Sequence, residues 1–311
     1  MLVFSTCWNS SQYQEGLSML EEIADLGFEY VELSHGLKVS MLPGIMEAVD
    51  RGVIKVAGVH NYFPAPIDEM GDTPDGKPFT SDRPEIRRHA IDLTKKSMER
   101  GAALGARYIV LHMGTVESID SKKAHDELRK VVSAGKIGTR EYADLKGKWI
   151  RKRQNKAEMY FARCQAALNQ LLPLAKDLGM VLGVEGRSHF DQVPNEYEAI
   201  RLMDEFKDEP LVRYWHDFGH IQRKHNLLMA HHEEFIASVA SSIGGAHIND
   251  VKWPLRDHQI PFYGGDVDFD CLLKYFPTGI PYVWELSSQC KDTDIKLALA
   301  KWKEKFPFTL K

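Results

Sequence analysis

The chain has 311 residues, of which 43% are hydrophobic and 27% charged, and its formal net charge at pH 7 is −4. This length and balance suit a globular protein with one large domain or two small ones. The acidic net charge gives no general attraction for nucleic acid or anionic lipid, and no apolar run reaches membrane-spanning length.

Residues 1–8 read MLVFSTCW and lack both the basic stretch and the long apolar stretch of a signal peptide. The four cysteines are widely spaced and form no C-x-x-C pair: Cys7, Cys164, Cys271 and Cys290. Such spacing gives no disulfide framework in a chain of this length, so we expect free thiols and a cytoplasmic location.

Eight apolar runs rich in Val, Ile, Leu, Phe and Tyr predict buried parallel strands. In chain order they are residues 1–8, 28–34, 54–63, 106–113, 180–187, 211–218, 245–251 and 281–287. Helical patterns separate them at 14–26, from Pro84 to a stop at Gly105, and at 160–178, 196–206 and 233–243.

Eight strands that alternate with helices predict an α/β protein, a single-domain (β/α)8 barrel over residues 1–311. A doubly wound sheet is the rival, but no G-x-G-x-x-G sequence follows the first strand. The pattern breaks at residues 115–160, an insertion with helical stretches and the basic tail KGKWIRKRQNK. We interpret the tail as a solvated face, or as a lid, dimer arm or phosphate-facing flap over the barrel mouth.

Four residues with metal-binding side chains end four successive predicted strands in the second half of the chain. They are Glu185 in MVLGVEGR, Asp217 in VRYWHDFGH, His247 in GAHINDV and Glu285 in PYVWELS. A buried carboxylate is costly unless it is paired or bound to a cation. Four such residues at matching strand positions therefore predict a shared divalent metal ion, and so an enzyme.

More polar residues gather where the predicted strands end. His60 and His112 end the third and fourth strands, His220 and Asp250 follow two predicted ligands by three residues, and His258 lies in the loop PLRDHQIPFYGG. Because barrel active sites are built from the C-terminal ends of the strands, we place these residues around the predicted metal. The histidines on predicted helices or their caps are expected on the surface: His89, His225, His231 and His232.

Five short motifs resemble those of the xylose isomerase-like superfamily of barrels, which holds sugar isomerases, sugar epimerases and endonuclease IV. They are E-G-R at 185–187, D-F-G-H at 217–220, H-I-N-D at 247–250, D-H with a following G-G at 257–265, and W-E-L at 284–286. The resemblance spans nearly the whole chain apart from the insertion. It implies a metal bound by Glu185, Asp217, His247 and Glu285, an acid–base pair formed by the two glutamates, and substrate contact by His220.

The chemistry of the four residues agrees with that implication. Three carboxylates and one imidazole form a mostly oxygen site, which suits one divalent ion of Mn, Mg or Co and tolerates Zn. A metal that holds the carbonyl and hydroxyl of a ketose favours an enediolate, while two carboxylates can remove and return a proton. A purely structural metal usually wants a closed cage of Cys and His.

The resemblance gives His60 and His112 two interpretations. In endonuclease IV the matching histidines bind an additional zinc and share the residue that matches Glu185. In single-metal sugar enzymes this position faces the substrate. We expect substrate contact here, with a second metal or a buried structural histidine as the alternatives.

Two arginines complete the predicted site. In endonuclease IV a third zinc is bound by residues that match His220, His258 and a carboxylate two positions before His258. That position is Arg256 here, and a cation repels a nearby metal ion, which argues against DNA repair. We expect Arg256 and His258 to contact the substrate. Arg187, on the same strand face as Glu185, is expected to pair with a carboxylate or to hold a substrate oxygen or phosphate.

The sequence thus predicts a metal-dependent sugar isomerase or epimerase of carbohydrate metabolism, which forms an enediolate from a ketose, keto-acid or sugar phosphate. A lyase or dehydratase of a keto-sugar could use the same metal site, because the same enolate can expel a β-hydroxyl. An apurinic-site nuclease would want a basic surface and three metals, and a sugar-binding barrel without activity would not need the complete ligand set. The expected partner is a small-molecule carbohydrate, with no membrane and no nucleic acid, and a homo-oligomer stays open.

Overall fold

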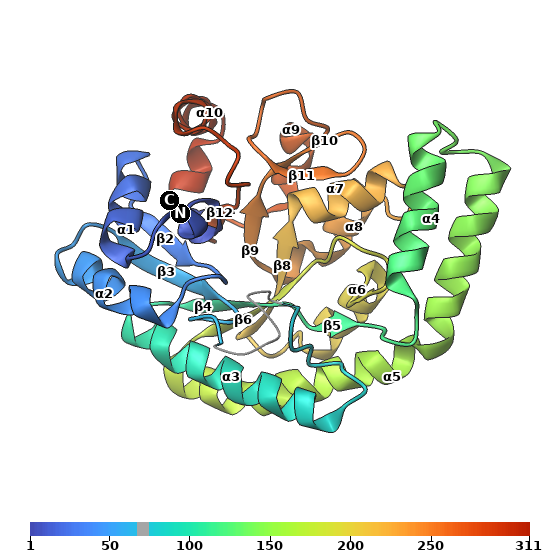
Figure 1. Ribbon diagram of the computed structural model, residues 1–311, viewed down its shortest axis with the longest axis horizontal. Coiled ribbons are helices and arrows are strands. Elements are labelled where there is room, and N and C mark those ends of the chain that lie inside the picture. The colour runs from blue at the N-terminus through green and yellow to red at the C-terminus, as the bar shows by residue number, and fades with distance from the viewer. Residues whose placement is uncertain (67–74) are drawn as a thin grey trace.

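Eight parallel strands close into a barrel in the computed structural model, which describes residues 1–66 and 75–311. The strands are β1 (Leu2–Ser5), β2 (Tyr30–Leu33), β3 (Lys55–His60), β4 (Tyr108–Leu111), β6 (Val181–Glu185), β8 (Val212–Asp217), β9 (Ile243–Ile248) and β12 (Tyr282–Trp284). Each lies beside the next of these in chain order, and β12 closes the ring against β1 (Figure 1). The predicted (β/α)8 barrel is confirmed, and every predicted strand overlaps one of the eight.

Helices surround the barrel (Figure 1). They are α1 (Gly16–Asp25), α2 (Leu42–Asp50), α3 (Pro84–Ala103), α4 (Ser121–Ser133), α5 (Arg140–Leu178), α6 (Glu196–Glu205), α7 (Phe218–Asn226), α8 (His232–Val239), α9 (Phe269–Leu272) and α10 (Asp292–Lys305). Short 3-10 turns lie at Thr6–Trp8, Ser10–Gln12, Val39–Met41, Ala240–Ser242, Leu273–Tyr275 and Pro307–Leu310. Within the described ranges, no helix combines the length and the apolar character that a membrane crossing requires.

Large aromatic side chains fill the barrel below the ends of the strands. The rings of Tyr108 and Trp215 are buried, with their centroids 4.4 Å apart. Gly58 and Gly245 make room for them, because a Cβ atom at either glycine would lie 2.2 Å from the facing ring. Trp215 precedes Asp217 by two residues in β8, so both side chains lie on the inner face. The indole therefore forms a floor under the predicted ligands.

The segment 115–160 contains α4 and the first half of α5, which stand side by side at the right of Figure 1. α5 continues without a break to Leu178, so this segment shares one 39-residue helix with the barrel wall. The basic tail lies in that helix. Arg153 of the tail is buried rather than solvated, and its guanidinium donates two hydrogen bonds to Glu198 of α6. This ion pair fastens α5 to the barrel.

Two short antiparallel ribbons extend the loops that follow the strands. β5 (Gly114–Thr115) pairs with β7 (Gln192–Val193), and β10 (Asp250–Lys252) pairs with β11 (Arg256–Gln259). Both ribbons directly follow strand ends that carry predicted site residues, so they help to fix the walls of the barrel mouth.

Candidate metal centre

The four predicted metal ligands come together at the C-terminal ends of their strands. Glu185 and Asp217 are the last residues of β6 and β8, His247 lies near the end of β9, and Glu285 directly follows β12. One ligand atom from each lies within 4.8 Å of the others. All four side chains are buried, Glu285 being the most exposed at 4%. The four predicted ligands, which come from four separate strands, therefore form one compact cluster.

The three carboxylates converge on one nitrogen of His247. Its Nδ1 atom lies 3.6 Å from an oxygen of Glu185, 3.6 Å from an oxygen of Asp217 and 3.2 Å from an oxygen of Glu285. His247 Nδ1 and Glu185 Oε1 are buried and make no hydrogen bond in the described part of the chain. Orphaned buried atoms are costly, and a cation between them would satisfy both. The residues present therefore fit a divalent metal ion.

The pKa of His247 indicates that a metal ion would take the place of a proton on this ring. Burial alone would lower the pKa of this imidazole, but the carboxylates of Glu285 and Glu32 raise it well above its usual value. Without a metal, this rise in pKa favours the protonated ring beside its acidic neighbours. A metal ligand must be the neutral imidazole, so a bound metal would displace this proton and take over its charge.

Glu32, which the sequence analysis overlooked, orients the histidine. It lies on β2 with its carboxylate fully buried, and its Oε1 atom lies 3.3 Å from His247 Nε2. A carboxylate that accepts from one ring nitrogen leaves the other nitrogen to face the metal. The signal was present in the sequence, since Glu32 is a charged residue inside the apolar run 28–34.

We expect Glu32→Gln to weaken binding of Mn²⁺ by about 10- to 100-fold, the usual effect of losing such an outer partner. The amide keeps the size of the side chain but removes the negative charge that raises ligand basicity. Competition with a chelator measures the affinity. Glu29→Gln, an exposed position shortly before β2, is the control and should bind as the natural protein does. Equal affinities in the two variants would refute this role of Glu32.

Asn249 holds a second ligand in place. Its amide nitrogen lies 3.2 Å from both carboxylate oxygens of Asp217. Asp217 also accepts a hydrogen bond of 2.7 Å from the backbone nitrogen of His220, and so caps α7. The carboxylate is therefore both a candidate ligand and the start of a helix, which fixes its orientation.

His60 and His112 lie against Glu185. Their Nε2 atoms lie 3.1 Å and 2.6 Å from Glu185 Oε2, and the three residues form a second group that could hold a metal ion. Burial would raise the pKa of Glu185, but His112 and the other histidines around it hold that pKa well below its usual value.

Arg187 lies beside this second group and pairs with Asp75. One guanidinium nitrogen is in close contact with His112 Nε2, and the other lies 2.9 Å from Asp75 Oδ2. The predicted carboxylate partner thus exists, on a loop far away in sequence. A metal ion held by His112 would lie next to the guanidinium charge and would be repelled. This geometry favours substrate contact over a second metal at His60 and His112.

His220 and His258 form a third group with Asp217 that could hold a metal ion. His220 Nδ1 lies 3.0 Å from Glu185 Oε1, and His258 Nε2 lies 3.5 Å from Glu285 Oε2. Arg256 is exposed on β11 and donates a hydrogen bond of 2.8 Å to Gln289. The structure therefore brings both histidines to the centre and places Arg256 at its outer edge.

One predicted surface histidine is buried instead. His232 is 3% exposed, and its ring lies 3.0 Å from His216 Nε2 and 2.9 Å from Gln222 Oε1. The expectation was wrong because the first residue of α8 turns its side chain toward β8. His89 and His231 are exposed as expected.

Comparisons with known proteins agree with this architecture. The sequence model of the family described as xylose isomerase-like TIM barrel matches residues 20–278. No curated protein matches the chain. Eight of the solved structures that resemble it are 12–18% identical in sequence, and at such identities a likeness shows the fold alone.

Three of these solved structures serve as examples of the structural similarity. A D-tagatose 3-epimerase-like protein has a TM-score of 0.68 at 16% identity, with 99% of this chain and 98% of that chain covered. The 3-keto-D-glucoside 4-epimerase from E. coli has a TM-score of 0.65 at 15% identity, with 97% and 98% covered. The IOLI protein, solved with a bound zinc atom, has a TM-score of 0.63 at 15% identity, with 99% and 97% covered.

Proposed function

Because this chain belongs to the xylose isomerase-like TIM barrel family, we propose that it is a metal-dependent sugar epimerase or isomerase that acts through an enediolate. The observation that carries the proposal is the convergence of four buried ligand atoms from Glu185, Asp217, His247 and Glu285 on one position. The neighbours that are named as sugar epimerases support the reaction class, and the neighbour with zinc supports the metal.

Glu185 and Glu285 suit the roles of acid and base. They come from β6 and β12, which are separated in the barrel by β8 and β9, so they approach the centre from different walls. Although burial would raise both pKa values, neighbouring histidines lower them, so both groups are ionised at neutral pH and can accept a proton. We assign them removal and return of the proton on the carbon beside the carbonyl. A divalent ion, when bound, would stabilise the negative oxygens of the enediolate.

The remaining predicted site residues are proposed to orient the sugar. His60, His112 and His220 all lie within about one hydrogen bond of Glu185, so their rings surround the place that a sugar beside this carboxylate would take. The ring of His258 lies beside Glu285 in the same way. The ion pair with Asp75 holds the Arg187 guanidinium in a fixed direction, which suits a donor to a carbonyl or hydroxyl oxygen.

A nuclease is the second candidate, because Asp217, His220 and His258 do form a third group that could hold a metal. Two observations weigh against it. The Arg187 guanidinium lies beside the His60–His112 group, and the net charge of −4 repels a phosphate backbone. The sugar epimerase therefore stays the main proposal.

Solvent exchange separates these candidates. With the metal-loaded protein in D₂O and a panel of ketoses and keto-sugars, we expect deuterium at the carbon beside the carbonyl in the recovered sugar. The reason is that a carboxylate base which exchanges its proton with solvent returns deuterium instead. Mass spectrometry and proton NMR measure the label. Protein treated with a chelator is the control and should give none.

An internal proton shuttle could hide the label, so a sugar that reacts without exchange is tested again with deuterium already at that carbon. An enediolate route then shows a slower rate, because the C–H bond breaks. A lyase would give a dehydrated product with the same isotope effect. Cleavage of abasic DNA, with neither exchange nor an isotope effect on any sugar, would overturn the proposal in favour of the nuclease.

A further inference from the structure

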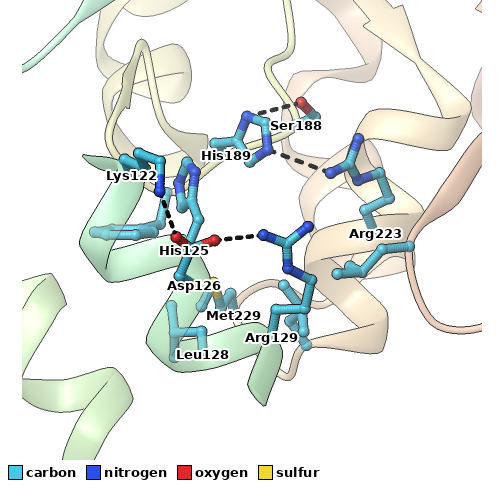
Figure 2. Close-up of a pocket in the computed structure, with 12 residues that line it drawn as sticks. Lys122, His125, Asp126, Leu128, Arg129, Ser188, His189, Arg223 and Met229 are labelled. Atoms are coloured by element: carbon cyan, nitrogen blue, oxygen red, sulfur yellow. Dashed lines mark hydrogen bonds and ion pairs between the residues drawn. The ribbon is translucent and has the colours of Figure 1, made fainter. Parts of the chain in front are cut away.

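A cavity of about 320 Å³ lies between α4, the loop after β6 and α7 (Figure 2). We call it the distal pocket. Its volume is within the range of small-molecule sites. Much of its lining is apolar, from residues on four different segments: Leu128, Phe190, Leu227, Met229 and Leu255. One wall of the pocket is α4, which lies in the inserted segment 115–160. A (β/α)8 barrel without this insertion would therefore lack the pocket.

The distal pocket shares a wall with the metal centre. Arg223 lines the pocket and follows His220 by three residues on α7, which places their Cβ atoms about 5–6 Å apart. Its guanidinium donates a hydrogen bond of 2.5 Å to Asp257. Asp257 in turn lies 3.3 Å from His258, whose other ring nitrogen lies 3.5 Å from Glu285. Two side chains, Asp257 and His258, thus connect the pocket residue Arg223 to the candidate ligand Glu285.

The cations around the pocket already have carboxylate partners. Asp126 accepts from both Lys122, at 2.9 Å, and Arg129, while Arg223 is paired with Asp257. Burial lowers the pKa of His189 to about 3, so this ring is neutral. A phosphate would have to compete with Asp126 and Asp257, which already pair with all three of these cations. The pocket suits a neutral group that has apolar faces and hydrogen-bonding edges.

The polar side chains are held in fixed directions across the pocket. Figure 2 shows His125 and Arg129 of α4 facing His189 and Arg223. The rings of His125 and His189 stack with centroids 4.2 Å apart, and Asp191 fixes His125 through a contact of 2.8 Å. These groups are prepared to bind hydroxyls while the apolar residues pack against a ring face, the combination that a sugar ring requires.

We propose that the distal pocket is a subsite for a second sugar ring, so that the substrate is a disaccharide or a related glycoside rather than a free ketose. This inference rests on the proposed function of the metal centre. The reacting ring lies over the metal ligands, and the glycosidic bond carries the second ring past Arg223 into the pocket.

Calorimetric binding to the Mn²⁺-loaded protein tests the subsite. The probes share one fructose unit: D-fructose, the glucosyl-fructoses turanose, maltulose, leucrose and isomaltulose, and the two fructose monophosphates. We expect at least one disaccharide to bind at least about tenfold more tightly than fructose. In Leu255→Trp and in Met229→Trp, which fill the pocket from different segments, the ratio of disaccharide to fructose affinity should fall toward one. Melting curves show which variants are folded.

Ala162→Trp is the matched control, since it adds the same side chain to an exposed groove between α3 and α5. It should keep the full affinity ratio. The subsite is overturned if no disaccharide binds more tightly than fructose, if a monophosphate gains more than every disaccharide, or if the gain survives in both folded filling variants. If deuterium exchanges into fructose but no disaccharide binds more tightly than fructose, the subsite proposal is wrong and the proposed epimerase function stands. If a disaccharide binds more tightly and the filling variants abolish this difference, but no sugar exchanges deuterium, the epimerase function is wrong and the subsite stands.

Discussion

Glu185→Gln should lower turnover by roughly two to four orders of magnitude, the usual share of general acid–base catalysis. Glutamine has the same size and keeps one oxygen that can face a metal, but it cannot accept a proton at neutral pH. The change also removes the charge that His60 and His112 surround. Steady-state rates and elemental analysis, measured on the same preparation, should show low turnover with part of the metal retained.

Glu205→Gln is the control for this variant, because Glu205 lies exposed on α6. It should match the natural protein in both measurements. If Glu185→Gln is fully active with its metal bound, Glu185 is a ligand only, and Glu285 would have to move the proton alone.

Asp217→Asn should reduce metal affinity by more than about 100-fold, beyond the usual effect of losing an outer partner, and activity should be lost with it. The variant removes one of three negative charges around the metal position. It keeps an oxygen that can accept from the backbone nitrogen of His220, so the cap of α7 survives. Asp217→Ala would also lose that cap, at a cost of about 1 kcal/mol. Metal content after dialysis and the rate at saturating Mn²⁺ are the two measurements.

The comparison of Asp217→Asn with Glu185→Gln separates two roles. A pure ligand recovers activity when metal is added in excess, because only affinity has changed. A base does not recover, because the proton transfer itself is lost. If saturating metal restores the activity of Glu185→Gln but not of Asp217→Asn, then Glu185 is the pure ligand and Asp217 the base, the reverse of the proposed assignment.

The order of strands and helices was readable from the sequence because a parallel barrel buries both faces of every strand. Such strands are continuous apolar runs, and a charged residue at the end of one stands out. For that reason the eight strands and the cluster of Glu185, Asp217, His247 and Glu285 could be predicted together. The apolar run 1–8 was longer than the strand, which ends at Ser5, because a 3-10 turn follows in which the Ser5 side chain accepts from the backbone nitrogen of Cys7.

Partners from distant segments were beyond the sequence, because local periodicity says nothing about which loops meet. Asp75 lies 112 positions from Arg187, and Glu32 lies 215 positions from His247. β1 and β12 separate β2 from β9, and only closure of the barrel brings side chains of their inner faces together. The basic tail likewise looked solvated, and only the packing of α5 on α6 showed that Arg153 is buried against Glu198.

The sequence by itself determined the barrel and the identity of the candidate ligands, since both depend on residue type at regular positions along strands. The tertiary structure decided which atoms face one another. It turned Nδ1 of His247 toward the carboxylates, placed Arg187 beside His112, and left Arg256 outside. It also set α4 across from α7, and with it the distal pocket, because the direction of an inserted helix depends on the contacts it finds rather than on its own pattern.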